Sequence, residues 1–236
     1  MRATLSAFGS ILWTVSILFI LVKLYKPTKE SGFSYKLFRG SLFWSYLNFG
    51  LFTAFLSVVL FTDDVVLAGL IGYVIGHVFL YISLAFFIFA PFSIFKPDDQ
   101  KIPKLLSIII LISGTIISYI NWIAYTSGDN TPEVANNGIM IWNPPNLVFF
   151  YIIILTISTW GIMGIGLFWY HAMNTDNKVL KKRSFLMGLG FLMLILSGPV
   201  HDVENISQTI IILVDIMAAL AILFQGYAIS LDPRKS

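Results

Sequence analysis

Cysteine is absent from the 236-residue sequence, and charged residues are scarce. The lack of cysteine excludes disulfides, thiolate metal sites, iron–sulfur clusters and lipidated cysteines. Only 11% of the residues are charged, against roughly 25% in a typical soluble domain. So little polar surface cannot coat a water-soluble globule. The composition therefore predicts an integral membrane protein whose main partner is the lipid bilayer.

Several motifs of enzymes and cofactor sites are also missing. The sequence has no HExxH zinc motif, GxSxG nucleophile elbow, P-loop or Rossmann glycine fingerprint. No lysine lies in the interior of a predicted span, since Lys23 and Lys104 are at span ends, and this excludes a retinal Schiff base. A haem held between two helices is disfavoured because His77 is the one histidine deep in a span. We expect no enzyme and no cofactor. The net charge of +3 is sorted by membrane side, so nucleic acid is not an expected partner.

What the sequence does contain is long apolar runs, each of which predicts a membrane-spanning helix. A helix suits the bilayer because it satisfies its backbone hydrogen bonds within the segment. Seven runs predict a single all-α domain, a seven-transmembrane-helix bundle over residues 1–236. They lie near residues 6–25, 38–61, 65–95, 104–125, 147–170, 184–200 and 206–230. The third is too long to stand upright, and Pro91 predicts a bend near its end.

The basic residues predict the direction of the bundle. Fourteen of the 15 lysines and arginines fall in the tail or in the loops after the first, third and fifth spans, or beside them. The other side carries Arg2 and six acidic residues. Because cytoplasmic loops retain lysine and arginine during insertion, we expect the N-terminus outside and the C-terminus in the cytoplasm. The cell membrane is the expected location. The first run resembles a signal peptide, but it continues to Leu24 and meets a basic flank, so we expect a retained helix.

Two ionisable residues are predicted at membrane depth, where each is a candidate functional group because burying it is costly. Asp215 lies about 15 Å into the last span, and His77 lies about 20 Å into the third, at 1.5 Å per residue. Helical spacing adds neighbours on the same faces, and depth adds one residue of the second span. The candidate substrate or proton site consists of Asp215, His77, Asn48, Tyr73, Tyr81 and Gln208.

These residues allow several functions. A small proton-coupled or small-solute transporter is the leading hypothesis, with the polar cluster as its mid-membrane site. A non-catalytic sensor, or an accessory or structural subunit bound to other membrane subunits, is the alternative. The same polar groups can also form an interhelical hydrogen-bonded pair that only fixes packing.

The three outer loops supply further hypotheses. Acidic residues and a histidine there predict a weak metal site, or simply solvated loop ends; they are Asp63, Asp64, His201, Asp202 and Glu204. The long outer loop, residues 126–146, is expected to consist mainly of turns. Its apolar stretch Ile139–Trp142 is expected to lie on the bilayer surface as an anchor, with a lid over a binding site as the alternative.

Overall fold

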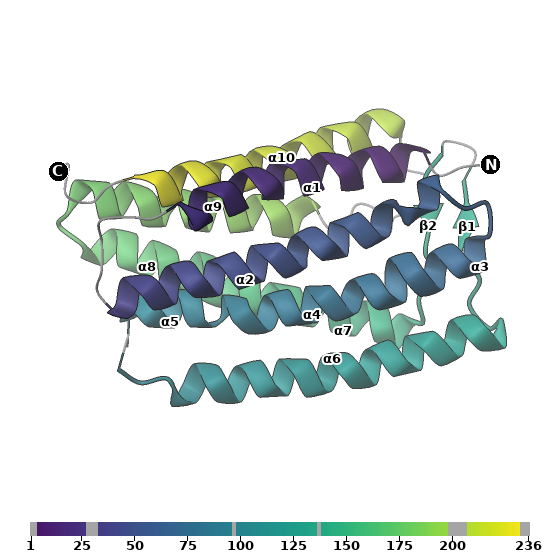
Figure 1. The fold of residues 1–236 in the computed structure, drawn as a ribbon, viewed down its shortest axis with the longest axis horizontal. Coiled ribbons are helices and arrows are strands. Elements are labelled where there is room, and N and C mark those ends of the chain that lie inside the picture. Colours follow the sequence, from purple (N-terminus) through teal and green to yellow (C-terminus); the bar gives the residue numbers. More distant parts are fainter. Residues whose placement is uncertain (1–3, 27–32, 96–97, 136–137, 198–206, 232–236) are drawn as a thin grey trace.

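The computed structural model describes residues 4–26, 33–95, 98–135, 138–197 and 207–231. Helices make up nearly all of this part of the chain, which confirms the all-α class (Figure 1). In chain order the elements are α1 (Thr4–Tyr25), α2 (Phe33–Leu56), the 3-10 turn η1 (Ser57–Leu60), α3 (Val65–Ala68), the π-helix η2 (Gly69–Ile75), α4 (Gly76–Phe87), α5 (Phe89–Phe95), α6 (Lys101–Ser127), β1 (Glu133–Val134), β2 (Met140–Ile141), α7 (Asn146–Thr156), the π-helix η3 (Ile157–Gly166), α8 (Leu167–Asn174), α9 (Lys178–Ser197) and α10 (Gln208–Ser230).

The helices join end to end into long rods. Among the described residues, six rods are long and apolar enough to cross a bilayer. The exception is α9, whose first two turns carry Lys178, Lys181, Lys182 and Arg183. Apolar side chains on the outside of the bundle, such as Ile108, Ile112 and Ile116 of α6, are largely exposed. A lipid bilayer accommodates such an apolar surface. The protein is therefore a multi-pass membrane protein.

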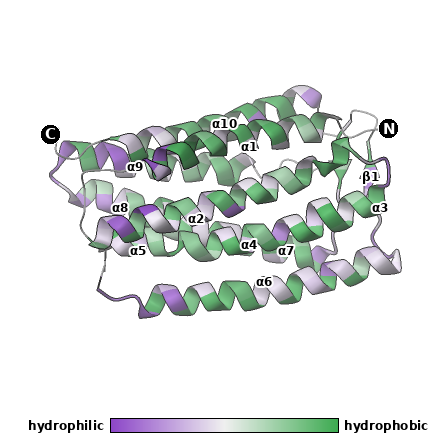
Figure 2. Ribbon diagram, in the orientation of Figure 1, coloured by the Kyte–Doolittle hydropathy of each residue, from purple (hydrophilic) through white to green (hydrophobic). Residues whose placement is uncertain are grey.

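The rods form a closed ring in chain order. Helix α1 packs against α2 and α10, α2 packs against α4, and α4 packs against α6. The ring continues from α6 to α7, from η3 to α9 and from α9 back to α10. Figure 1 shows the two short strands at the end of the bundle near the N-terminus, with the C-terminus at the opposite end. Figure 2 shows that the helix middles are mostly hydrophobic and that hydrophilic residues gather toward the ends.

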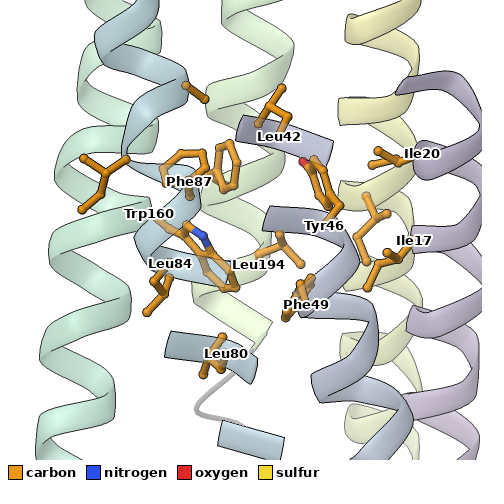
Figure 3. Close-up of a cluster of buried hydrophobic side chains, with 14 of the residues drawn as sticks. Ile17, Ile20, Leu42, Tyr46, Phe49, Leu80, Leu84, Phe87, Trp160 and Leu194 are labelled. Carbon is orange, nitrogen blue, oxygen red and sulfur yellow. The ribbon is translucent and has the colours of Figure 1, made fainter. Parts of the chain in front are cut away.

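Large apolar side chains fill the middle of the ring. Figure 3 shows residues of α1, α2, α4, η3 and α9 converging there, among them Tyr46, Phe87, Trp160 and Leu194. Five aromatic residues of this core form a continuous chain of ring contacts with centroids 5.1 to 6.4 Å apart, which we call the aromatic column; they are Phe49, Trp160, Phe191, Phe168 and Phe38. The column runs along the inside of the bundle.

The helix boundaries differ from the predicted ones in informative places. Helix α9 begins at Lys178, six residues before the predicted start at 184, because the Asn177 side chain caps it by accepting from the amides of Val179 and Leu180 at 3.0 Å each. In the third rod, α4 ends at Phe87 and α5 follows after Ile88. Phe87 lies four residues before Pro91, and a proline ring clashes with that carbonyl.

The long loop over residues 126–146 also differs from its prediction. Instead of turns alone, it contains the antiparallel pair β1–β2, in which Glu133 lies opposite Ile141 and Val134 opposite Met140. Ile139, Met140 and Trp142 are buried against the bundle. The stretch therefore packs against the bundle and does not lie on the bilayer surface as the expected anchor.

Candidate functional site

A cavity of about 160 Å³ lies inside the ring, on the side of the aromatic column nearer the strands. Six of the seven rods contribute to its wall, and the strand pair covers part of it. Its lining is mostly aromatic and aliphatic, with a few hydroxyl groups, one histidine and one carboxylate. The polar lining residues are Ser6, Ser10, Tyr73, His77, Thr156 and Asp215, and the aromatic ones include Trp13, Phe49, Phe52, Trp142, Phe149 and Trp160.

Asp215 reaches this cavity from α10 and is only 1% exposed. It lies against α1, whose residue 9 is glycine. A Cβ atom at position 9 would overlap the Asp215 carboxylate, so only glycine lets α1 approach this closely. Ser6 and Ser10, one turn apart on α1, line the same cavity. The carboxylate thus lies at a close α1–α10 contact, with hydroxyl groups of α1 on the same cavity wall.

His77 reaches the cavity from the first turn of α4 and is buried. Its Nδ1 lies 2.8 Å from the carbonyl oxygen of Tyr73. A carbonyl oxygen only accepts, so Nδ1 carries the proton and Nε2 of the neutral ring is an acceptor. The imidazole packs between two rings, with centroid distances of 4.1 Å to Tyr73 and 5.0 Å to Phe52. These contacts fix both the tautomer and the orientation of His77.

Two of the cavity-lining rods are π-helical where they meet the cavity. Tyr73 belongs to η2, which leads directly into the turn that bears His77. Ile157 and Trp160 belong to η3 and line the opposite part of the wall. Insertions of π-helix into α-helices are uncommon and are frequent at functional sites. A π-helical insertion also rotates the residues that follow it about the helix axis. Each of these two rods can therefore line the cavity with one segment and pack on neighbouring helices with the next.

The strand pair covers the end of the cavity that lies near the N-terminal end of the bundle. The amide of Met140 donates to Ser6 Oγ at 2.9 Å, and the amide of Leu5 donates to the Gly138 carbonyl at 3.1 Å. The Tyr125 hydroxyl donates to the Trp142 carbonyl at 2.5 Å. The cover is therefore attached to α1 and to α6, and its Met140 and Trp142 side chains form part of the cavity wall.

The structure brings together three of the six predicted site residues, since Asp215, His77 and Tyr73 line one cavity. Asn48 is buried in α2, where its Nδ2 donates to the Trp44 carbonyl at 2.7 Å, and it is not part of the lining. Tyr81 packs against Gly114 of α6, and its ring centroid lies 6.3 Å from that of His77, but it is not part of the lining.

Gln208 is exposed in the first turn of α10 and does not line the cavity. The predicted outer metal site is mostly beyond the described residues, because His201, Asp202 and Glu204 fall in the range 198–206. Asp64 is the N-cap of α3 and accepts from two backbone amides. Within the described ranges, no group of three histidine or acidic residues is close enough to hold a metal ion.

Sequence reasoning missed the hydroxyl and tryptophan side chains of the wall. Ser6 and Ser10 on α1 recur at a spacing of four residues, which places them on one helical face. Trp13 and Trp160 give no such signal, because an aromatic residue in a span is equally compatible with lipid contact. The spacing of the two serines on α1 could thus have indicated their place in the wall, whereas the place of the tryptophans could be found only from the structure.

The chemistry of the wall suits a small positively charged group. Aromatic faces attract cations through the negative potential of the ring, and such sites commonly recognise quaternary ammonium groups. A buried carboxylate adds a full opposite charge in surroundings of low dielectric constant. The volume is close to that of a cavity of about 150 Å³ that accommodates benzene. Known protein families and curated proteins give no match to this chain, so its function is argued from this geometry.

Proposed function

We propose that this protein is a seven-span, non-enzymatic carrier of the cell membrane that exchanges a small organic cation for a proton. The observation that supports this most is the shared cavity of Asp215, His77 and Tyr73 inside a wall of aromatic rings. A carboxylate at membrane depth needs a partner, a cation or a proton. When the cation leaves, a proton taken up by Asp215 keeps the site neutral, which gives a one-for-one exchange.

The proposed orientation has the N-terminus outside. The helix ends that carry Lys36, Lys104 and Lys178 lie at the C-terminal end of the bundle, which suits the cytoplasm. Helix α9 counts as the seventh span in this proposal. Its 20 residues extend about 30 Å at 1.5 Å per residue, with the basic first turns at the cytoplasmic interface.

The absence of cysteine makes this orientation easy to test. Asp129→Cys and Lys181→Cys each introduce a single thiol, at opposite ends of the bundle. In intact cells, a membrane-impermeant maleimide should label Cys at position 129 and should leave position 181 unlabelled until the cells are opened. The reverse pattern would contradict the proposed direction, and labelling of both in intact cells would contradict an odd number of spans between the two positions.

Uptake into liposomes tests the carrier. Radiolabelled choline serves as the probe because it combines a quaternary ammonium group with small size. With the liposome interior more acidic than the exterior, we expect protein-dependent choline accumulation that collapses when a proton ionophore is added. Asp215→Asn should abolish the accumulation, since the amide keeps the shape of the carboxylate and removes its charge.

Asp176→Asn is the matched control, because Asp176 is exposed in the short α8–α9 connection. It should accumulate choline as the wild type does. Circular dichroism and thermal unfolding establish that both variants are folded. Equal choline accumulation by Asp215→Asn and the wild type would exclude this carboxylate as the cation site.

A sensor that binds the same cation without carrying it is the second candidate. It is favoured by the packing in the middle of the bundle, where large buried side chains such as Leu42, Leu84 and Phe87 come together (Figure 3). A carrier has to open this packing in part of its cycle, whereas a sensor does not. Choline binding to the purified protein without any uptake into liposomes would select the sensor.

A further inference from the structure

A second pocket, of about 210 Å³, lies at the opposite end of the bundle and contains a deeply buried arginine. Its wall is built by the first two turns of α2 and the second and third turns of α9, together with α5 and α8. Arg183 of α9 is only 6% exposed. The lining residues are Ser34, Tyr35, Phe38, Ser93, Ile94, Phe168, His171, Arg183, Ser184 and Met187. No carboxylate is among them within the part of the chain that the structure describes.

The position of Arg183 departs from its predicted place in a cytoplasmic loop. Because the Asn177 cap starts α9 at Lys178, Arg183 lies in the second turn of this helix and faces the interior of the ring. Its exposed neighbours Lys181 and Lys182 have the solvated positions expected of loop-end charges. A buried guanidinium has a large desolvation cost, which an opposite charge normally offsets.

Two aromatic rings orient the guanidinium. Its Cζ atom lies 5.3 Å from the centre of the Tyr35 ring and 5.1 Å from that of Phe38. Of the described residues, none is a hydrogen-bond partner for its Nε or its Nη2. These two nitrogens form one edge of the planar group, the edge that binds a carboxylate or phosphate through two parallel hydrogen bonds. The ring contacts thus restrain the guanidinium, while the Nε–Nη2 edge has no hydrogen-bond acceptor among the described residues.

A second arginine nearby shows that the arrangement is specific to position 183. Arg39 also lies over the Tyr35 ring, at 5.7 Å, but its Nη2 donates to the carbonyls of Lys23, Leu24 and Lys26 at 2.6 to 2.9 Å. Arg39 is therefore occupied in capping the end of α1. Two positive groups flank one tyrosine ring, and this concentrates positive potential at the pocket.

Neighbouring side chains add hydrogen-bonding capacity. Ser184 Oγ lies 2.8 Å from Nδ1 of His171, and both residues line the pocket beside Arg183. Ser34 supplies a further hydroxyl to the lining. Hydroxyl and imidazole groups around a guanidinium fork are suited to an anion with several oxygens rather than to a halide.

We propose that this pocket binds a phosphate group, to which the Nε–Nη2 edge of Arg183 donates hydrogen bonds. The phosphate can come from an anionic phospholipid of the adjacent leaflet or from a soluble phosphate, and both share the chemistry that the fork recognises. Basic pockets between membrane helices on the cytoplasmic side commonly bind such headgroups. The site is separate from the carboxylate cavity and does not depend on the carrier proposal.

Thermal unfolding of the purified full-length chain in an uncharged detergent tests the site. The probes are inorganic phosphate, with chloride at equal ionic strength as its control, and dihexanoylphosphatidylglycerol, with phosphate-free dihexanoylglycerol as its control. We expect at least one phosphate-bearing probe to raise the unfolding temperature in a saturable way. A rise with phosphatidylglycerol alone identifies a lipid headgroup, and a rise with both probes identifies a site open to soluble phosphate as well.

Three variants separate the site from a general charge effect. Arg183→Gln should lose the rise, whereas Lys181→Gln, which removes an exposed charge two residues away, should retain it. Arg183→Lys keeps the charge without the planar fork and should bind at least about tenfold more weakly. Without phosphate, Arg183→Gln should unfold at the wild-type temperature or above it, because a buried charge has been removed. No rise with either probe, or an undiminished rise in Arg183→Gln or Arg183→Lys, would overturn the proposal.

Discussion

The carboxylate cavity and the arginine pocket each enclose one buried charged side chain, and the two charges have opposite signs. Asp215 lies against the backbone of α1 at Gly9, in a cavity whose wall includes residues of two π-helical segments. Arg183 lies between aromatic rings at the start of α9. The aromatic column separates them, since Phe49 and Trp160 line one cavity while Phe38 and Phe168 line the other.

This difference suggests that the two charges are kept for different ligands. An ion pair between them would offset the desolvation of both, yet the fold places them in different cavities. The first cavity has rings and a carboxylate, which favour a cation, and the second has a guanidinium edge, which favours an oxyanion. The regions can therefore be perturbed one at a time.

The largest expected effect is at the close contact beside Asp215. Gly9→Ala places a methyl group where the Asp215 carboxylate lies, so the carboxylate or α1 has to shift. We expect the free energy of unfolding to fall by about 3 kcal/mol, as for an overpacked core. At position 40, a Cβ meets no atom within 4 Å, so Gly40→Ala should instead stabilise α2 by about 0.5 to 1 kcal/mol. Equal unfolding temperatures for the two variants would contradict the close contact.

The next effect compares the two arginines. Arg39→Gln removes the donor that serves the last carbonyls of α1, and we expect a loss of about 2 kcal/mol in unfolding free energy. Arg183→Gln should cause no such loss in phosphate-free detergent. Thermal unfolding of the two variants side by side checks this. If Arg183→Gln were as destabilising as Arg39→Gln, the buried arginine would have a structural role instead.

Much of the bundle could be predicted from sequence, because apolar runs of about 20 residues have few alternatives in a membrane. The start of α9 could also have been found, since Asn177 followed by an apolar pattern is an N-cap signal. The burial of Arg183 could not, because an arginine at a helix start normally extends to water. Depth suggested one site for Asp215 and His77, and the two residues line one cavity. Depth could not show that Asn48 and Tyr81 are outside the lining, because this depends on how each rod is rotated about its own axis.

The region between the cavities provides a third comparison. The Tyr46 hydroxyl donates to Gln225 Oε1 at 2.6 Å, and both side chains are buried. Tyr46→Phe leaves the amide oxygen without this donor, and we expect a loss of about 1 kcal/mol in unfolding free energy. Tyr25→Phe, at a residue that is 82% exposed, should change the unfolding free energy little. A Tyr46→Phe variant as stable as Tyr25→Phe would show that this hydrogen bond contributes nothing to the middle of the bundle.

The smallest expected effect concerns the cover of the carboxylate cavity. Ser6→Ala removes the acceptor for the Met140 amide, so hydrogen exchange at Met140 should become about threefold faster. Ser16→Ala is the matched control, because Ser16 donates to the Leu12 carbonyl within α1. Its exchange at Met140 should equal that of the wild type. Unchanged exchange in Ser6→Ala would mean that other contacts hold the strand pair in place.

The most direct test of the central claim is the charge preference of the carboxylate cavity, measured by isothermal titration calorimetry on the purified protein. The ligands are choline and 3,3-dimethylbutan-1-ol, which has nearly the same shape and no charge. The account predicts that the wild type and Asp176→Asn bind choline at least about tenfold more tightly than the alcohol, and that Asp215→Asn loses this preference. Equal affinities in the wild type, or a preference that persists in Asp215→Asn, would contradict it.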